Sequence, residues 1–165
     1  MNDSKIEYAV IQHHHVLRLE GDVRYQDVMP LHEFLERLEV DDQPFILDLS
    51  GVTLLDSTAL GILAMVAKRC RNQGLDMPVL YVVDPAVRDI LLGVCFDQVF
   101  KMTGENPLLS STVTAKPLEP VQLSLDEVSD TVKVAHEELA DIDEKNRELF
   151  KDVNNLLAQL GSKSA

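Results

Sequence analysis

Residues 45–63 read FILDLSGVTLLDSTALGIL, and this stretch decides the fold class. The segment FILDL, introduced by Pro44, is a nearly continuous apolar run, which is typical of a central strand covered on both faces. After Ser57 the apolar spacing becomes helical, and one helical face collects four residues: Leu60, Leu63, Ala64 and Ala67. The stretch therefore predicts a buried strand that passes directly into a helix.

The segments on either side continue this alternation of strands and helices. Gly74 is expected to end the helix that follows Ser57, and Asp84 and Pro85 are expected to open another. The remaining expected elements are strands at 6–12 and 16–20 joined as a hairpin through His13–His15, a helix at 27–39, a strand at 79–83, a helix at 84–94 and a strand at 98–102. This order predicts an α/β domain with a mixed sheet that closes near residue 103.

The composition favours protein partners. The 165 residues carry a formal net charge of −13, and acids outnumber bases both before and after residue 103. Such a surface repels phosphate backbones and anionic lipids, which argues against nucleic-acid and membrane binding. Cys70 and Cys95 form no CxxC pair, and no segment has the apolar core of a secretion signal or a membrane span. We expect a soluble, cytoplasmic protein.

The first candidate site is Asp56-Ser57-Thr58, where the buried strand passes into the helix. In open α/β sheets, ligands and partners dock at this carboxyl edge of the strands. The simpler interpretation is that Ser57 or Asp56 caps the helix. The two interpretations are compatible, because a phosphate at a helix N-terminus meets free amides and the positive end of the dipole.

Other chemistry has weaker support in the sequence. His13-His14-His15 suggests a metal site, but alternation puts only His13 and His15 on one strand face, so a polar hairpin is the better interpretation. There is no Gly-rich phosphate loop, and His32 and His136 lie in helical patterns without an assigned partner. We expect no enzyme activity, no cofactor and no metal.

Two stretches resemble the STAS domain, the fold of anti-sigma factor antagonists. They are FILDLSGVTLLDSTALGIL and PVLYVVDPAVRDILLGVCFDQVFKM, and the resemblance covers roughly residues 5–103 of a STAS-like domain expected at 1–103. The most specific part is DSTALG, in which an acid and a hydroxyl residue follow the apolar strand, and CFDQVF supports it.

The resemblance implies a switch between partners. Ser57 would be the phosphoacceptor, with Thr58 as second choice, and an anti-sigma factor with serine-kinase activity would modify it. A PP2C-type phosphatase would remove the phosphate, and the unphosphorylated form would bind the anti-sigma factor. The docking loop would comprise Asp56, Ser57, Thr58, Ala59, Leu60 and Gly61. Two positions depart from many members of the family: Ala59 replaces a glycine, and Arg24 replaces an acid, which bears on partner recognition.

The C-terminal third lies outside the resemblance. Residues 104–123 contain three prolines and predict a linker, and residues 124–161 predict one long helix opened by a Ser124–Glu127 capping box. Apolar residues follow at alternating spacings of three and four, with Asn146 as the one polar member: Leu125, Val128, Val132, Ala135, Leu139, Ile142, Asn146, Leu149, Val153, Leu156 and Leu160.

This heptad seam predicts homo-oligomerisation as a coiled coil. The alternatives are capture of a partner helix and a helix folded back on its own domain. Whether the helices of such a coiled coil run parallel, run antiparallel or form a four-helix arrangement also remains open. A second functional hypothesis follows, in which an unphosphorylated STAS scaffold assembles through this helix.

Overall fold

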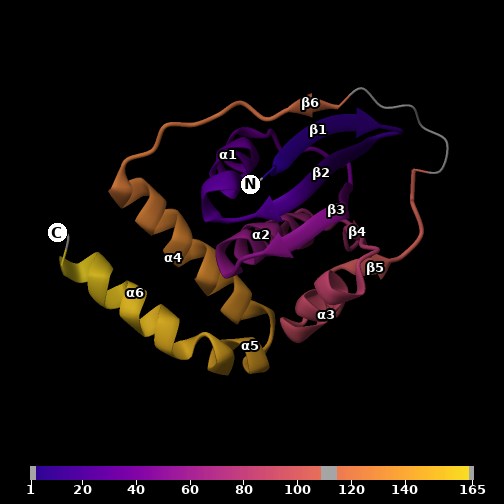
Figure 1. Ribbon diagram of the computed structural model, residues 1–165. Helices are drawn as coiled ribbons and strands as arrows, with labels where there is room; N and C mark the ends of the chain where they lie inside the picture. Colours follow the sequence, from indigo (N-terminus) through magenta and orange to yellow (C-terminus); the bar gives the residue numbers. More distant parts are fainter. Residues whose placement is uncertain (1–2, 109–114, 164–165) are drawn as a thin grey trace.

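The computed structural model describes residues 3–108 and 115–163, with the side chains of residues 160–163 left out. The elements follow one another as β1 (Lys5–Ile11), β2 (His14–Val23), α1 (Tyr25–Arg37), β3 (Phe45–Leu55), α2 (Ser57–Asn72), β4 (Val79–Tyr81), α3 (Pro85–Gly93), a 3₁₀ turn (Phe96–Gln98), β5 (Lys101–Thr103), β6 (Lys116–Pro117), α4 (Leu125–Ile142), α5 (Glu144–Leu149) and α6 (Lys151–Lys163). The predicted α/β class is confirmed (Figure 1).

Within the described residues, six strands form one mixed sheet in the order β5-β4-β3-β2-β1-β6. The pairs from β2 to β5 are parallel, whereas β1 pairs antiparallel with both β2 and β6. The predicted hairpin turns at Gln12 and His13, whose φ angles of 48° and 63° are the positive values that a tight two-residue hairpin turn requires. Strand β6 lies within the segment 104–123, so the chain returns to the sheet edge before the C-terminal helices begin.

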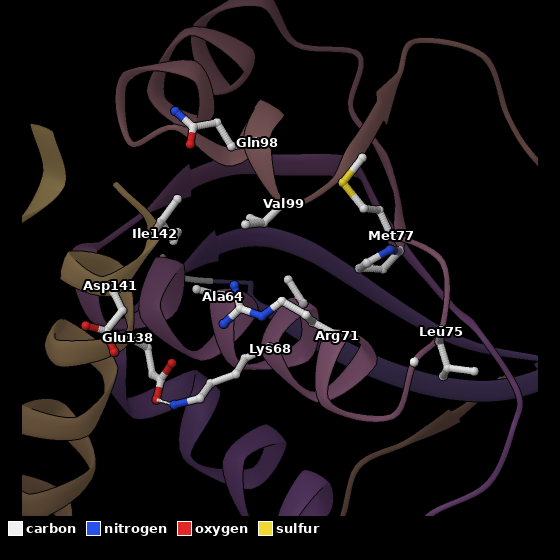
Figure 2. A pocket seen from close by; sticks show the side chains of 13 residues that line it. Ala64, Lys68, Arg71, Leu75, Met77, Gln98, Val99, Glu138, Asp141 and Ile142 are labelled. Carbon is white, nitrogen blue, oxygen red and sulfur yellow. Dashed lines mark hydrogen bonds and ion pairs between the residues drawn. The ribbon is translucent and has the colours of Figure 1, made fainter. Parts of the chain in front are cut away.

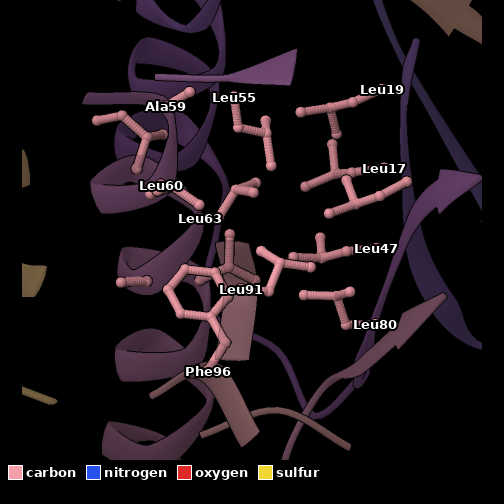
Figure 3. Close-up of a cluster of buried hydrophobic side chains, with 14 of the residues drawn as sticks. Leu17, Leu19, Leu47, Leu55, Ala59, Leu60, Leu63, Leu80, Leu91 and Phe96 are labelled. Carbon is pink, nitrogen blue, oxygen red and sulfur yellow. The ribbon is translucent and has the colours of Figure 1, made fainter. Parts of the chain in front are cut away.

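The core lies between the sheet and the helices that cover it. Figure 3 shows leucines of β2, β3 and β4 meeting those of α2 and α3, among them Leu17, Leu47, Leu80, Leu63 and Leu91, each 0% exposed. Each such side chain stabilises the fold by about 1.5–3 kcal/mol through its removal from water. The first five residues of β3, Phe45–Leu49, are buried at every position, which accounts for the nearly continuous apolar run there.

The strand predicted at 98–102 is shifted and shortened. The structure has a 3₁₀ turn at Phe96–Gln98 and a strand only at Lys101–Thr103. Phe96 and Phe100 are both buried, and their ring centroids lie 5.0 Å apart. Residues four positions apart lie next to each other on one side of a helical turn. In a strand, residues 96 and 100 would lie on the same face but far apart along it.

The long C-terminal helix predicted for 124–161 is instead three helices. The Ser124–Glu127 capping box that opens α4 is confirmed, with the Ser124 Oγ accepting from the Glu127 N–H at 3.1 Å. Asp143 then adopts an extended conformation (φ −158°, ψ 153°), ends α4 and caps α5 by accepting from the Lys145 N–H at 2.8 Å. A second break at Phe150 separates α5 from α6. Helix α4 packs across α2, and α6 runs back beside α4 (Figure 1).

The predicted oligomerisation seam is divided by this arrangement. Leu139 and Asn146 are fully buried within their own chain, because α4 and the start of α5 lie on the domain. Leu125, Leu149, Val153 and Leu156 are exposed, Val128, Val132 and Ile142 are half-buried, and the side chain of Leu160 lies outside the described part. Self-association through the exposed seam residues stays a prediction.

Candidate partner-docking site at the start of helix α2

Asp56 fixes the junction between β3 and α2. Its Oδ1 accepts from the Ala59 N–H at 2.8 Å, and its Oδ2 accepts from the Tyr25 N–H at 2.7 Å. One carboxylate therefore caps α2 and also binds the first residue of α1. This satisfies two backbone donors that helix starts leave unpaired. Asp56, and not Ser57, is the cap, which leaves the Ser57 hydroxyl available for another role.

Ser57 is the first residue of α2, and its hydroxyl meets a histidine from the C-terminal region. The Ser57 Oγ lies 2.8 Å from Nε2 of His136 on α4. The other ring nitrogen, Nδ1, lies 2.8 Å from the Val132 carbonyl oxygen. Because a carbonyl oxygen only accepts, Nδ1 of the neutral ring carries the proton, and Nε2 accepts from the Ser57 hydroxyl.

His136 is held rigidly in this position. It is 5% exposed, and its ring packs edge-on against Phe150 with centroids 5.9 Å apart. In a Ser-His-acid triad a carboxylate would orient the imidazole, whereas here a backbone carbonyl does so. The pair therefore lacks the acid that stabilises an imidazolium during acyl transfer.

The other residues of the predicted docking loop differ in accessibility. Thr58, Ala59 and Leu60 are 5%, 0% and 4% exposed, so they belong to the core, whereas Ser57 is half-buried at its rim. A modifying enzyme reaches Thr58 only if the first turn of α2 opens. The geometry thus favours Ser57 over Thr58 as the hydroxyl that a modifying enzyme can reach.

Gly61 lies where α4 crosses α2. A Cβ added at Gly61 would overlap the backbone of Ala135, including its carbonyl oxygen. Farther along α2, the Lys68 ammonium donates to the Glu138 carboxylate at 2.7 Å, and this hydrogen bond raises the pKa of Lys68. Figure 2 shows this ion pair beside a cavity of about 290 Å³ between α2 and α4. Contacts between the two helices therefore include Ser57–His136, Gly61–Ala135 and Lys68–Glu138, and we call the close approach at Gly61 and Ala135 the crossing.

Arg24 lies at the same edge of the sheet. It precedes Tyr25, whose N–H binds Asp56, and its guanidinium donates to both carboxylate oxygens of Asp22 at 3.1 and 3.0 Å. This hydrogen bonding lowers the pKa of Asp22. The side chain of Arg24 is 52% exposed, so it remains accessible to a partner. The structure thus brings together all of the residues predicted to dock a partner, although four of them, Thr58, Ala59, Leu60 and Gly61, are buried.

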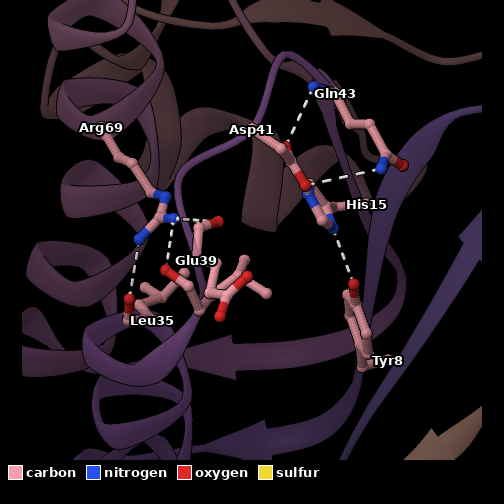
Figure 4. Close-up of polar contacts among 8 residues, drawn as sticks. Tyr8, His15, Leu35, Glu39, Asp41, Gln43 and Arg69 are labelled. Atoms are coloured by element: carbon pink, nitrogen blue, oxygen red, sulfur yellow. Dashed lines mark hydrogen bonds and ion pairs between the residues drawn. The ribbon is translucent and has the colours of Figure 1, made fainter.

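A second polar cluster was not predicted from the sequence (Figure 4). His15 is 3% exposed and lies between the Tyr8 hydroxyl at 2.6 Å and the Asp41 carboxylate at 3.0 Å. The hydrogen bond from His15 lowers the pKa of Asp41. Arg69 donates to three backbone carbonyls at and just beyond the C-terminal end of α1, those of Leu35, Leu38 and Glu39. Apart from the Tyr8–His15 contact, these contacts join residues 26 to 34 positions apart, and no local motif in the sequence marks them.

Two classes of site were searched for within the described ranges. In residues 3–108 and 115–163 no three His, Cys, Asp or Glu side chains are grouped so that they could hold a metal ion. None of the helices in that part of the chain is both long and apolar enough to cross a membrane.

The comparison with protein families places the STAS domain within this chain. A family model described as STAS domain matches residues 5–115, which is about two thirds of the chain. The matched region begins with β1 and includes the start of α2 with Ser57. It ends before β6, so α4, α5 and α6 lie beyond it.

Proposed function

The chain belongs to the STAS domain family, and on this premise we propose that it is a phosphorylation-gated anti-sigma factor antagonist. In this proposal Ser57 is the phosphoacceptor, and the unphosphorylated chain binds an anti-sigma factor that is also the serine kinase. A PP2C-type phosphatase restores the binding form. The observation that carries the proposal is the position of the Ser57 hydroxyl, which lies at the rim of α2 while the next three residues are buried.

The position suits a modification that changes binding and leaves the fold intact. A phosphoryl group at the first residue of α2 lies at the N-terminus of the helix, near its first amides and the positive end of the helix dipole. It adds about −1.5 to −2 charges to a surface that a partner must cover. Burying such a charge against a partner without compensation costs several kcal/mol, and about 1.4 kcal/mol already weakens binding tenfold.

Protein partners also suit the charge of the chain. The formal net charge of −13 disfavours nucleic acid and anionic lipid, and a basic patch on a protein partner would complement it. We infer a binding module without catalysis of its own, since the Ser57–His136 pair lacks an orienting acid.

The test is phosphorylation of the full chain by the candidate serine kinase, followed by intact-mass measurement and peptide fragmentation. We expect one phosphate on Ser57, none on Ser57→Ala, and normal modification of Ser129→Ala, a matched control at an exposed position on α4. A phosphate that maps to Thr58 would move the site but keep the mechanism. A chain that the kinase binds and never modifies would instead support the scaffold hypothesis.

Binding titrations give the second arm of the test. We expect Ser57→Ala to bind the anti-sigma factor whether or not kinase and ATP are present. We expect Ser57→Asp to bind at least tenfold more weakly, because a carboxylate places charge at the same surface. Equal affinities of wild type, Ser57→Ala and Ser57→Asp would rule out gating at this residue.

A further inference from the structure

We propose that the face of α2 from Ser57 to Lys68 is a helix-docking surface, that α4 occupies it within the chain, and that a partner binds by displacing α4. The displacing partner presents a helix with a small residue over Gly61 and a carboxylate near Lys68. The identity of Ser57 as the regulated residue rests on the proposed function, whereas the coverage of this face by α4 is independent of it.

The shape of α2 is the first argument. Glycine in a helix interior is less favourable than alanine, so Gly61 weakens α2 taken alone. The cost is offset where the missing Cβ lets another backbone approach, as the Ala135 backbone does. Ala64 and Ala67 continue the same small-residue face and line the cavity next to the crossing. This face is built to receive the backbone of another helix.

The Ser57–His136 hydrogen bond is the second argument. With α4 in place, the Ser57 proton is donated to Nε2 at 2.8 Å, and His136 is 5% exposed. A kinase must bring its phosphoryl donor to the same oxygen that His136 covers. Conversely, a phosphoryl group on this oxygen needs the space that the imidazole fills. Docking of α4 in this geometry and phosphorylation of Ser57 therefore oppose each other, and the coupling free energy between them is reciprocal.

The connection to the sheet is the third argument. The Leu118 N–H donates to the Ile6 carbonyl at 3.1 Å, which holds the chain at the sheet edge just after β6. Residues 119–124 lead from there to α4, and none of them is buried. Helix α4 can leave α2 without breaking any pair of strands. The region that matches the STAS domain ends at residue 115, so α4 is an addition to the domain that this family shares.

The alternative is that α4 is a permanent part of the core, since Ala135 and Leu139 are both 0% exposed. The two possibilities differ in what happens when only the crossing is blocked. Gly61→Ala strengthens α2 and clashes with α4. Gly93→Ala is a matched control, because a Cβ at Gly93 meets nothing within 4 Å.

The first experiment measures access to residue 57 in the full chain. Ser57→Cys is combined with Gly61→Ala or with Gly93→Ala, and modification of the new thiol by iodoacetamide is followed by mass spectrometry. Cys70 and Cys95 are 1% and 6% exposed, and burial raises the pKa of Cys70 to about 11, so the native thiols react slowly. We expect Gly61→Ala to raise the rate at least tenfold and Gly93→Ala to leave it unchanged.

Hydrogen exchange distinguishes displacement from unfolding. In Gly61→Ala, the amides of α4 should lose protection while those of β3 and α2 keep theirs. Loss of protection throughout the domain would show that α4 completes the core, and unchanged labelling and exchange would show that α4 does not leave. Either result overturns the proposal, and neither depends on the kinase or on the proposed function.

The second experiment measures partner binding. Ala135→Leu adds bulk at the buried α4 residue whose backbone lies against Gly61 and leaves the sequence of α2 unchanged, and Ala158→Leu is the matched control at an exposed position on α6. We expect Ala135→Leu to bind the anti-sigma partner about tenfold more tightly, which corresponds to about 1.4 kcal/mol, and Ala158→Leu to match wild type. Unchanged affinity of Ala135→Leu would show that the partner does not use this face, even where the labelling result stands.

Discussion

Asn146 gives the sharpest test of how the C-terminal region is held, because two arrangements predict opposite signs for one substitution. In a heptad coiled coil an asparagine in the seam lowers stability, so Asn146→Leu would raise it. In the structure Asn146 is 0% exposed, and its amide donates to the Val94 carbonyl at 2.7 Å and to the Leu139 carbonyl at 3.0 Å. The side chain thus fastens the turn after α4 to the end of α3.

The magnitude follows from these two bonds. Leucine at residue 146 would leave two buried carbonyls without their donor, at a cost of roughly 1–3 kcal/mol each. Two terms offset part of this cost: Asn146 Oδ1 is itself buried without a partner, and leucine gains apolar burial. We expect a net loss of about 2 kcal/mol, which lowers the melting temperature by about 4–8 °C for a chain of this size.

The assay is urea unfolding of the full chain at two protein concentrations, with light scattering on the same samples. Asn155→Leu, a matched change at an exposed position on α6, should leave the midpoint within error of wild type. A higher midpoint for Asn146→Leu that also increases with protein concentration would refute the intramolecular arrangement. That result would restore the coiled coil as the better description of the seam.

Two further predictions test the packing of α4 and the buried histidine. Leu139→Asp should destabilise the chain by several kcal/mol in urea, because it buries an unpaired charge at a residue that is 0% exposed, whereas Leu156→Asp, at a residue that is 58% exposed, should have little effect. Asp41→Asn should lower stability at neutral pH, because the pKa of Asp41 is depressed by His15 and its stabilising contribution is present above the ordinary carboxyl pKa of about 4. The gap between wild type and Asp41→Asn should close as pH falls through and below that value in a series of melts, with Asp42→Asn as control, and a gap that stays constant down to pH 3 would contradict the assignment.

The α/β core could be predicted because its signals are local. The run FILDL is apolar at successive positions, the change to helical spacing after Ser57 is abrupt, and Asp84 and Pro85 open α3 as expected. The strand after α3 was harder to place. Phe96 and Phe100 are both apolar, and a short apolar segment does not reveal whether its side chains alternate across a strand or share one side of a turn.

The C-terminal helices could not be placed from spacing alone. A seam at alternating intervals of three and four is the same whether a helix packs on a second copy, on a partner or on its own domain. Asp143 was a weak signal for the break, since aspartate favours helix starts and is common at helix surfaces as well. The Asn146 amide donates to the carbonyl oxygen of Leu139 in α4 and to that of Val94, which is 52 residues away in the sequence. No pattern along the chain links these positions.

Gly61 and its neighbours carry more information than the heptad spacing about where a second helix packs. A glycine inside a helix lowers the stability of that helix unless something occupies the space above it. In α2 the glycine is followed at helical spacing by Ala64, and the residue that fills the space is Ala135 of α4. Small residues on both helices predict close backbone approach, but they carry no information on whether the second helix belongs to the same chain. A helix from a partner that offers the same small residue meets the same surface, and for that reason α4 can hold the place of a partner and be displaced by one.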